Sequence, residues 1–332
     1  MKSWIAVASA LAVHAAFVQT AVPSRREITV STQPVPLSDA DPGVTKTGSM
    51  SYLGGLVLRS DDERFGGLSG LVADFDGGMV RLIAVTDQGE RFAATLALRN
   101  GRPQAIENAS IAPLIGPEGR GIVGKGLGDA ESLTRLPDGR LLAGFERRHR
   151  VWSFGPGLNG PATPFETPLA LKDAPSNGGL ESLASWPDGR VLAITEQQKT
   201  PSGNIAAYLH QGGSWSAIEW RPSDPGFEPS DASVTPDGDL LILERYYSPL
   251  QPLSVVSRVV RVRGASVRTG AILQGDVVGE LKTPLIIENF EGISAFKGPD
   301  GATWVALVSD DNLNGIQRTL LLLFDLRRPP TS

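Results

Sequence analysis

The sequence predicts an all-β protein, a β-propeller built from five repeat units, and three observations support this fold class. A unit of about 50 residues recurs five times, each unit contains short apolar runs typical of strands, and turn residues are frequent. The chain has 38 glycines and 25 prolines among 332 residues. A single hairpin cannot bury its apolar face alone, and packing units around an axis solves this problem. Five blades and six blades are both compatible with the spacing.

The composition excludes several classes of function. The chain has no cysteine, so disulfides, thiolate zinc sites, iron–sulfur clusters and cysteine nucleophiles are all excluded. With 31 basic against 36 acidic side chains, it lacks the basic surface that binds nucleic-acid phosphates. We therefore expect no nucleic-acid partner, and we expect a monomer whose ligand is a small molecule.

The amino-terminal segment has the organisation of a secretory signal peptide. Lys2 precedes an apolar run from Trp4 to about Val18, and small residues follow the run. An uncleaved membrane anchor is the alternative, but a span needs roughly 20 apolar residues, and this run is shorter and contains His14. We predict a signal peptide over residues 1–21, no stable membrane span after cleavage, and a periplasmic or secreted protein.

The segment that follows is predicted to be a flexible linker over residues 22–44. It contains four prolines among serine, threonine and aspartate, and it shows no hydrophobic period. No second segment of this kind follows, so residues 45–332 are predicted to form one propeller domain.

The repeat units share one order of features: a polar loop, an acidic residue beside a small one, a strand, a tight turn, a second strand and another acidic residue. The clearest unit runs from Gly128 through the turn Pro137–Gly139 to Glu146. The units are marked by Ser69, Glu131, Glu181, Asp231 and Glu291, which are spaced 62, 50, 50 and 60 residues apart. The last strand, Thr319–Leu326, is predicted to close the ring against the first, Met50–Leu58.

Hairpin geometry predicts where the acidic residues gather. Glu131 lies seven residues before the Asp138–Gly139 turn, and Glu146 lies seven residues after it. Antiparallel strands joined by a tight turn bring such residues side by side, roughly 5 Å apart, at the end away from the turn. The same count holds in the third unit, and a count of six relates Asp231 to Glu244 in the fourth.

If these hairpins supply the inner strands, a ring of acidic residues surrounds one mouth of the axial channel. It contains Glu131, Glu146, Glu181, Glu196, Asp231, Glu244, Glu291, Asp310 and Asp87, with Ser69 in the tenth place. Clustered carboxylates raise one another's pKa or recruit cations. Neighbouring arginines are one source of countercharge and a divalent metal is the other. Alternatively, many of these side chains cap loop amides and bond arginines between blades.

The ligand chemistry of this ring favours calcium. Its donors are oxygen atoms, and His149 and His210 are the histidines that follow the signal segment, so Ca²⁺ is preferred over zinc or copper, although another divalent cation also fits. Asp310–Gly315 reads D-D-N-L-N-G, which matches the first half of a calcium loop. Position 321 is leucine instead of the expected glutamate, so the segment is not an EF-hand. A loop of Asx-turns is the alternative.

Two further motifs match their patterns incompletely. Gly119–Lys125 fits the phosphate-binding pattern G-x-x-x-x-G-K, but Gly126 replaces the required Ser or Thr, so we predict that this loop only borders the mouth. Ser69 lies in G-L-S-G-L, which lacks the last glycine of the G-x-S-x-G pattern of serine hydrolases.

Several segments together carry a family pattern. They are F-G-G-L-S-G-L at 65–71, N-G-G-L-E at 177–181, L-I-L-E-R at 241–245, N-F-E-G at 289–292, and S-D-D-N at 309–312 followed by Q-R-T at 317–319. In these segments the chain resembles the phytase-like family of exported bacterial proteins, to which an esterase-like activity is ascribed. The resemblance implies a propeller and metal-assisted hydrolysis of phosphate or other esters. The chain departs from the family pattern at Ser132 and Ser182, where a glycine usually follows the glutamate.

These observations predict an exported hydrolase that acts on a small anionic ester at an acidic, calcium-binding axial site. The predicted metal ligands are Glu131, Glu181, Asp231, Glu291 and Asp310. Arg147, Arg245 and Arg318 are predicted to bind the substrate, and Glu196 or Glu244 to act as the general base. A non-catalytic propeller that binds a peptide, glycan or envelope protein, and a calcium-dependent lactonase, are the alternatives.

Overall fold

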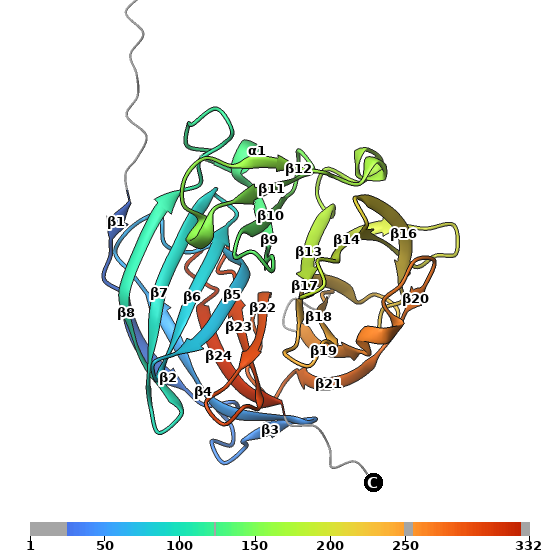
Figure 1. Cartoon of the computed structure of the whole chain (residues 1–332). Helices are drawn as coiled ribbons and strands as arrows, with labels where there is room; N and C mark the ends of the chain where they lie inside the picture. The colour runs from blue at the N-terminus through green and yellow to red at the C-terminus, as the bar shows by residue number, and fades with distance from the viewer. Residues whose placement is uncertain (1–24, 123, 249–254, 327–332) are drawn as a thin grey trace, which may run out of the picture.

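Five β-sheets surround a central axis and form a five-bladed β-propeller (Figure 1). The structure is a computed structural model that describes residues 25–122, 124–248 and 255–326. The inner strands of blades one to five are β5 (Leu68–Asp76), β9 (Ala130–Arg135), β13 (Leu180–Ser185), β17 (Glu228–Val234) and β22 (Phe290–Lys297). Each blade corresponds to one predicted repeat unit, so the number of blades is five.

Blades one to four run outward from the inner strand. Blade one continues with β6 (Met79–Thr86), β7 (Glu90–Arg99) and β8 (Arg102–Pro113), and β1 (Arg26–Glu27) pairs with β8. Blade two continues with β10 (Leu141–Phe145), β11 (Arg150–Phe154) and β12 (Thr163–Phe165). Blade three continues with β14 (Val191–Lys199), β15 (Ile205–Gln211), β16 (Ser214–Trp220) and the parallel β20 (Ile272–Leu273). Blade four continues with β18 (Leu240–Tyr246), β19 (Val256–Val262) and β21 (Asp276–Leu281).

The fifth blade closes the ring with strands from both halves of the chain. β22 pairs with β23 (Thr303–Ser309), β23 pairs with β24 (Thr319–Leu326), and β24 pairs with β4 (Met50–Arg59). The short strand β3 (Lys46–Thr47) also pairs with β4. Thr319 stands opposite Leu58, and Leu326 stands opposite Met50. The predicted closure of the last strand against the first is therefore confirmed.

The segment before β4 is ordered where a flexible linker was predicted. β2 (Ser31–Val35) pairs with β4, and Leu37 is fully buried among residues of blades four and five. The prediction of a flexible linker is therefore wrong for residues 25–44. β2 is an edge strand, where proline is tolerated because its missing N–H need not join the ladder. Pro34 of β2 accordingly stands opposite Leu56 without breaking the strand.

Helical segments are few and short. They are α1 (Lys125–Gly128), η1 (Pro156–Leu158), η2 (Leu169–Asp173) and η3 (Gly264–Ser266). Among the residues that the structure describes, no helix has the length and apolar character needed to span a membrane. The predicted signal peptide, residues 1–21, lies outside the described residues.

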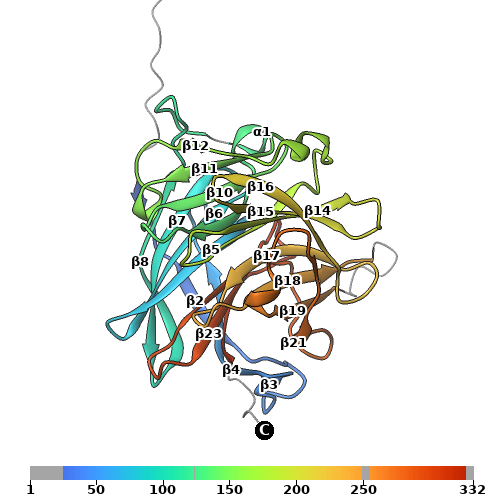
Figure 2. The same ribbon diagram turned by 45° about the vertical axis from the view of Figure 1, so that its right-hand side comes forward.

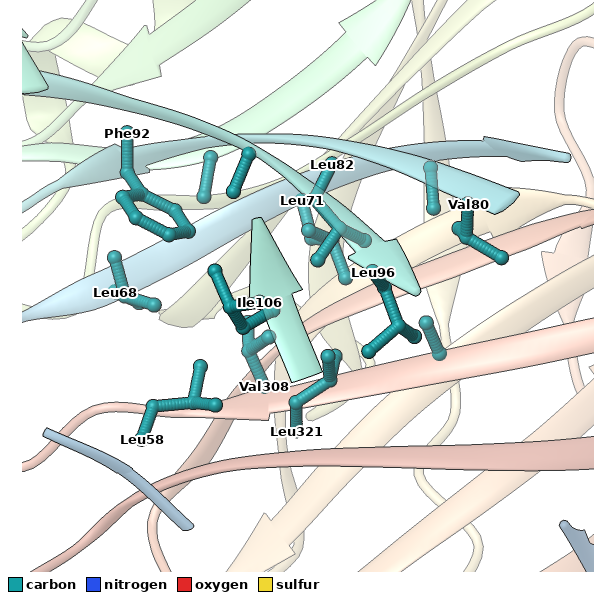
Figure 3. Close-up of a cluster of buried hydrophobic side chains, with 14 of the residues drawn as sticks. Leu58, Leu68, Leu71, Val80, Leu82, Phe92, Leu96, Ile106, Val308 and Leu321 are labelled. Carbon is teal, nitrogen blue, oxygen red and sulfur yellow. The ribbon is translucent and has the colours of Figure 1, made fainter. Parts of the chain in front are cut away.

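The hydrophobic core lies between neighbouring blades, because both faces of most sheets are covered. The five residues of β10 are all buried, whereas a sheet with one solvated face would alternate. Figure 2 brings blade three forward, and its strands β14–β16 pack as a layer over β17–β19 of blade four. Figure 3 shows the cluster between blades five and one, where Leu71, Phe92, Val308 and Leu321 meet. Burial of each such side chain contributes about 1.5–3 kcal/mol.

Candidate active site

Every inner strand carries a β-bulge at the same end of the axis. In blade two, Ala130 stands opposite Phe145 while Ser132 stands opposite Gly144, so Glu131 is the extra residue. A bulge sets two residues against one and redirects the extra side chain, and bulges often lie beside active sites. The equivalent extra residues of the five blades are Ser69, Glu131, Glu181, Ser230 and Glu291.

The bulge residues form one set of side chains, and a second set comes from the second strand of each blade. In four blades its member directly follows the paired part of the ladder, as in blade two, where the Glu146 N–H donates to the Asp129 carbonyl at 2.8 Å; in blade four Arg245 still pairs with Glu228. The Glu196 N–H donates to the Gly179 carbonyl at 2.8 Å in the same way. The equivalent residues of the five blades are Asp87, Glu146, Glu196, Arg245 and Asp310.

All members of these two sets except Ser69 and Ser230 line a cavity of about 810 Å³ at one mouth of the propeller. Its charged lining residues are Asp87, Lys125, Asp129, Glu131, Glu146, Glu181, Glu196, Glu228, Arg245, Glu291 and Asp310. Amide side chains of Asn177, Gln197, Asn289, Asn312, Asn314 and Gln317 complete the polar lining, and Tyr247, Val255 and Ile316 also line the cavity. The structure thus brings together most of the predicted acidic ring.

The prediction failed in blade four, where Asp231 and Glu244 lie outside the lining of the cavity. Counting seven residues from the Asp237–Gly238 turn, as in blades two and three, gives Ser230 and Arg245, whereas a count of six gave Asp231 and Glu244. In a strand a slip of one residue moves a side chain to the opposite face. The predicted roles of Asp231 as a metal ligand and Glu244 as the base are therefore corrected.

Both displaced carboxyls have structural partners. Asp231 Oδ2 accepts the Ile293 N–H at 2.8 Å, which ties blade four to blade five. Glu244 Oε1 accepts the Trp220 indole N–H at 2.9 Å, and the Ser223 N–H also donates to this carboxyl. Burial raises the pKa of Asp231 well above its usual value and raises the pKa of Glu244. These two groups tie strands and loops together away from the cavity.

Of the three arginines predicted to bind substrate, one lines the cavity. Arg245 donates to Glu291 Oε1 at 2.7 Å and to Glu196 Oε1 at 3.2 Å. Arg147 lies outside the lining and donates to Asp129 Oδ2 at 2.5 Å, and Arg318 lies outside it and donates to Glu288 Oε1 at 2.6 Å. The prediction that Arg147 and Arg318 bind the substrate is corrected, because neither lines the cavity and each guanidinium is already paired, that of Arg147 with the cavity carboxylate Asp129 and that of Arg318 with Glu288.

The loop after β23 is stabilised by Asx-turns. Asp311 Oδ1 accepts the N–H groups of Gly67 and Leu313 at 3.0 and 3.1 Å. Asn314 Oδ1 accepts two further amides of its own loop, both at 3.0 Å. Asx-turns and the contact with Gly67 thus order this segment, while its side chains Asp310, Asn312 and Asn314 line the cavity. Asp310 still lines the cavity, and its Oδ1 accepts the Asn312 N–H at 2.6 Å.

Three buried carboxyls at one side of the cavity form a candidate metal site. One oxygen from each of Asp129, Glu131 and Glu146 lies within 4.8 Å of the others. Asp129 is 2% exposed, and its Oδ1 accepts no hydrogen bond from any group in the described part of the chain. A buried carboxylate oxygen without a donor, beside two further carboxyls, fits a hard cation with oxygen ligands. Asp129 was missed because it precedes the strand, although it stands two residues before the bulge glutamate.

Burial and mutual repulsion shift the pKa values of this cavity upward. Burial, followed by the charges of Glu291 and Asp129, raises the pKa of Glu131 well above its usual value. Burial, followed by the charge of Glu131, does the same for Glu181. Burial raises the pKa of Glu196 to about 7, against the lowering effect of Arg245. At neutral pH the cavity therefore holds protons that a cation could replace.

Burial raises the pKa of two further carboxyls of the cavity, Asp310 and Asp87. Burial and the charge of Glu291 raise the pKa of Asp310 to about 8. Burial also raises the pKa of Asp87, although Lys125 Nζ lies 2.8 Å from its Oδ2 and opposes this effect. Lys125 is the last residue of the glycine-rich segment Gly119–Lys125, so this end of the loop borders the mouth as predicted. Ser69 occupies a bulge position, but neither His149 nor His210 lines the cavity, so no serine–histidine pair faces it.

The fold and the site define a class: a five-bladed β-propeller with an acidic cavity on its axis. The chain belongs to the phytase-like family, described as "esterase-like activity of phytase", whose sequence model matches residues 63–313. A comparison with curated protein sequences gave no match.

Solved structures share the propeller fold at low sequence identity. The α-L-arabinofuranosidase PaAbf62A from Podospora anserina is 14% identical, with a TM-score of 0.53 and coverage of 85% of this chain and 98% of that chain. The catalytic domain of a GH62 α-L-arabinofuranosidase from Coprinopsis cinerea is 13% identical, with a TM-score of 0.51 and coverage of 88% and 98%. At such identities the likeness concerns the fold alone.

Proposed function

We propose that this chain is an exported hydrolase that acts on phosphate or related esters, with the axial cavity as its active site and a divalent cation, Ca²⁺, as its cofactor. The observation that carries the proposal is the buried group Asp129, Glu131 and Glu146, in which one Asp129 oxygen has no donor among the described residues. The description of the family, which names an esterase-like activity, is consistent with this function.

The three carboxyls of this group would hold the cation. Glu181, Glu291 and Asp310, which were predicted as ligands, line the same cavity and offer further carboxyl oxygens. A bound divalent cation would lower the pKa of water and screen a negatively charged ester from the carboxylates. Oxygen ligands alone favour calcium or magnesium over softer metals.

Glu196 is the proposed general base. It lines the cavity, its pKa of about 7 suits proton exchange near neutral pH, and Arg245 Nη2 holds one of its oxygens at 3.2 Å. The same guanidinium donates to Glu291 Oε1 at 2.7 Å, so it fixes two carboxylates of the cavity at once. Arg245 would therefore orient the base. Its N–H groups already bind Glu196 and Glu291, so it would bind a substrate oxygen only with N–H groups that also bind these carboxylates.

The charge of the cavity affects whether an anionic phosphate ester or a neutral carboxyl ester binds more easily. Among the described lining residues the cationic side chains are Lys125 and Arg245, and both are paired with carboxylates. An anionic phosphate ester would therefore need the cation, whereas a neutral carboxyl ester or lactone would meet less repulsion. This pairing favours a calcium-dependent lactonase or carboxylesterase as the second candidate function.

Hydrolysis assays on the purified protein test the proposal. p-Nitrophenyl phosphate, p-nitrophenyl acetate and a sugar lactone are each incubated with Ca²⁺ or with EDTA. We expect turnover that requires Ca²⁺ and is lost in Asp129→Asn but kept in Asp138→Asn, a carboxylate of an exposed turn. Turnover of the lactone or the carboxyl ester alone would select the second candidate. No turnover of any substrate with any divalent cation would contradict the proposal and favour a binding propeller.

A further inference from the structure

The carboxyl of Glu146 is held by a loop of the neighbouring blade. The N–H groups of Gly178 and Gly179 both donate to Glu146 Oε1, the latter at 2.7 Å. Successive backbone N–H groups aimed at one point form a nest that binds an anionic oxygen. Gly178 has a φ of 96°, a left-handed conformation that favours glycine. Both amides donate to Oε1, so Oε2 is the oxygen of this carboxyl that the nest leaves free to face a cation.

His149 in turn holds this loop. Its Nε2 lies 2.8 Å from the Pro175 carbonyl oxygen, and a carbonyl only accepts, so Nε2 carries the proton and donates. The imidazole also packs directly against Gly179, where an added Cβ would lie 1.9 Å from His149 Cε1. The Arg147 N–H donates to the Ser176 carbonyl at 3.1 Å, so the same segment is anchored twice. His149 itself does not line the cavity.

From these contacts we infer that His149 is a positioning residue for the cation site: its hydrogen bond to Pro175 and its contact with Gly179 orient the Gly178–Gly179 amides, which fix the Glu146 carboxylate. The inference rests on the proposed function, because it assigns a role toward the cation. The inference adds to the cation site a residue that lies outside the acidic ring. It also means that the ligands of blade two are positioned by the loop that leads into blade three. Groups that orient a metal ligand typically change metal affinity by about 10–100-fold.

The chain offers a matched set of variants. His149→Gln places an amide N–H where Nε2 lies and keeps the donor to Pro175, whereas His149→Ala removes both the donor and the ring. Gly179→Ala places a methyl group against the imidazole, and the double variant His149→Ala/Gly179→Ala removes that clash. His210→Ala is the control, because His210 makes edge-on ring contacts with Phe165 and Trp215 and does not line the cavity.

The test is Ca²⁺ affinity measured by isothermal titration calorimetry on the full chain, with circular dichroism to show that each variant is folded. We expect about tenfold weaker binding in His149→Ala, near wild-type binding in His149→Gln and His210→Ala, and weaker binding in Gly179→Ala. The double variant should bind no more weakly than His149→Ala. Unchanged affinity in His149→Ala, or His149→Gln as weak as His149→Ala, would overturn the inference. Binding by the wild type without hydrolysis would overturn only the proposed function, whereas no binding by the wild type would overturn both.

Discussion

Arg245 in blade four occupies the position that Glu196 occupies in blade three, and its Nη2 lies 3.2 Å from Glu196 Oε1. One blade thus supplies a cation where the other four supply a carboxylate. The guanidinium bridges Glu196 and Glu291, which come from the blades on either side of blade four. Burial lowers the pKa of Arg245, but the charges of Glu291 and Glu196 outweigh this effect and raise it, so the group stays charged.

Replacing Arg245 should therefore destabilise the fold. Arg245→Met leaves two carboxylates of the cavity without countercharge, and we expect a loss of about 3 kcal/mol in the free energy of unfolding at pH 8 without added cation. Urea unfolding measures this loss, and Ca²⁺ should restore part of it. Arg318→Met is the control, because Arg318 pairs with Glu288 outside the cavity and is 35% exposed, so we expect about 1 kcal/mol or less. Equal losses in both variants would contradict the bridging role.

The cation-free protein should lose stability as the pH rises. The pKa values of Glu196, about 7, and Asp310, about 8, lie above those of the unfolded chain. The native state therefore binds more protons than the unfolded state between about pH 4 and pH 8, so the free energy of unfolding falls across this range. We expect a fall of more than about 1.4 kcal/mol, seen by urea unfolding in EDTA, and a smaller slope in Glu196→Gln. A rise in stability from pH 5 to pH 8 in EDTA would show that these carboxyls are not protonated in the fold.

Calcium should bind more tightly at higher pH. A cation must displace the protons held by Glu131 and its neighbours, so the apparent affinity should rise by up to about tenfold per pH unit for each proton released. Calorimetry in two buffers of different ionisation enthalpy counts these protons at pH 6.5. Binding without proton release at that pH would mean that the cation lies elsewhere.

Asp231 should contribute to stability and not to cation binding. Because burial keeps its pKa high and its carboxyl accepts the Ile293 N–H, Asp231→Asn should cost less than about 1 kcal/mol, while Asp231→Ala should cost about 2 kcal/mol. The Ca²⁺ affinity of both variants should stay within threefold of the wild-type value, which corresponds to a change of less than about 0.7 kcal/mol in the free energy of binding. A Ca²⁺ affinity that falls tenfold in Asp231→Asn would return this residue to the site.

The fold and much of the cavity could be predicted from the repeats alone. Counting from each turn located Glu131, Glu146, Glu181 and Glu196, because a hairpin fixes the register of its two strands. In blade four a count of six gives an acidic residue in each place, whereas the count of seven that holds in blades two and three gives Ser230 and Arg245. Ser230 and Arg245 break the acidic pattern, and the bulge positions in the structure identify them as the equivalent residues.

Residues on the loops could not be placed in the same way. Asp129 and Lys125 precede the paired strand, and their direction depends on contacts with other segments, such as the ion pairs with Arg147 and Asp87. The sequence motif of Asp310–Gly315 suits both a calcium loop and Asx-turns. The Asp311 contact with the Gly67 N–H, made 244 residues away in the chain, could not be predicted from this motif.

The central claim, a cation held by three carboxyls of blade two at the mouth of the propeller, is tested most directly by crystallography with Tb³⁺ in place of Ca²⁺. Anomalous difference density should lie about 2.3–2.6 Å from carboxylate oxygens of Asp129, Glu131 and Glu146, and it should disappear in Asp129→Asn. Density at the loop of Asp310–Gly315 instead, or no density in the cavity of the wild-type protein, would contradict the account.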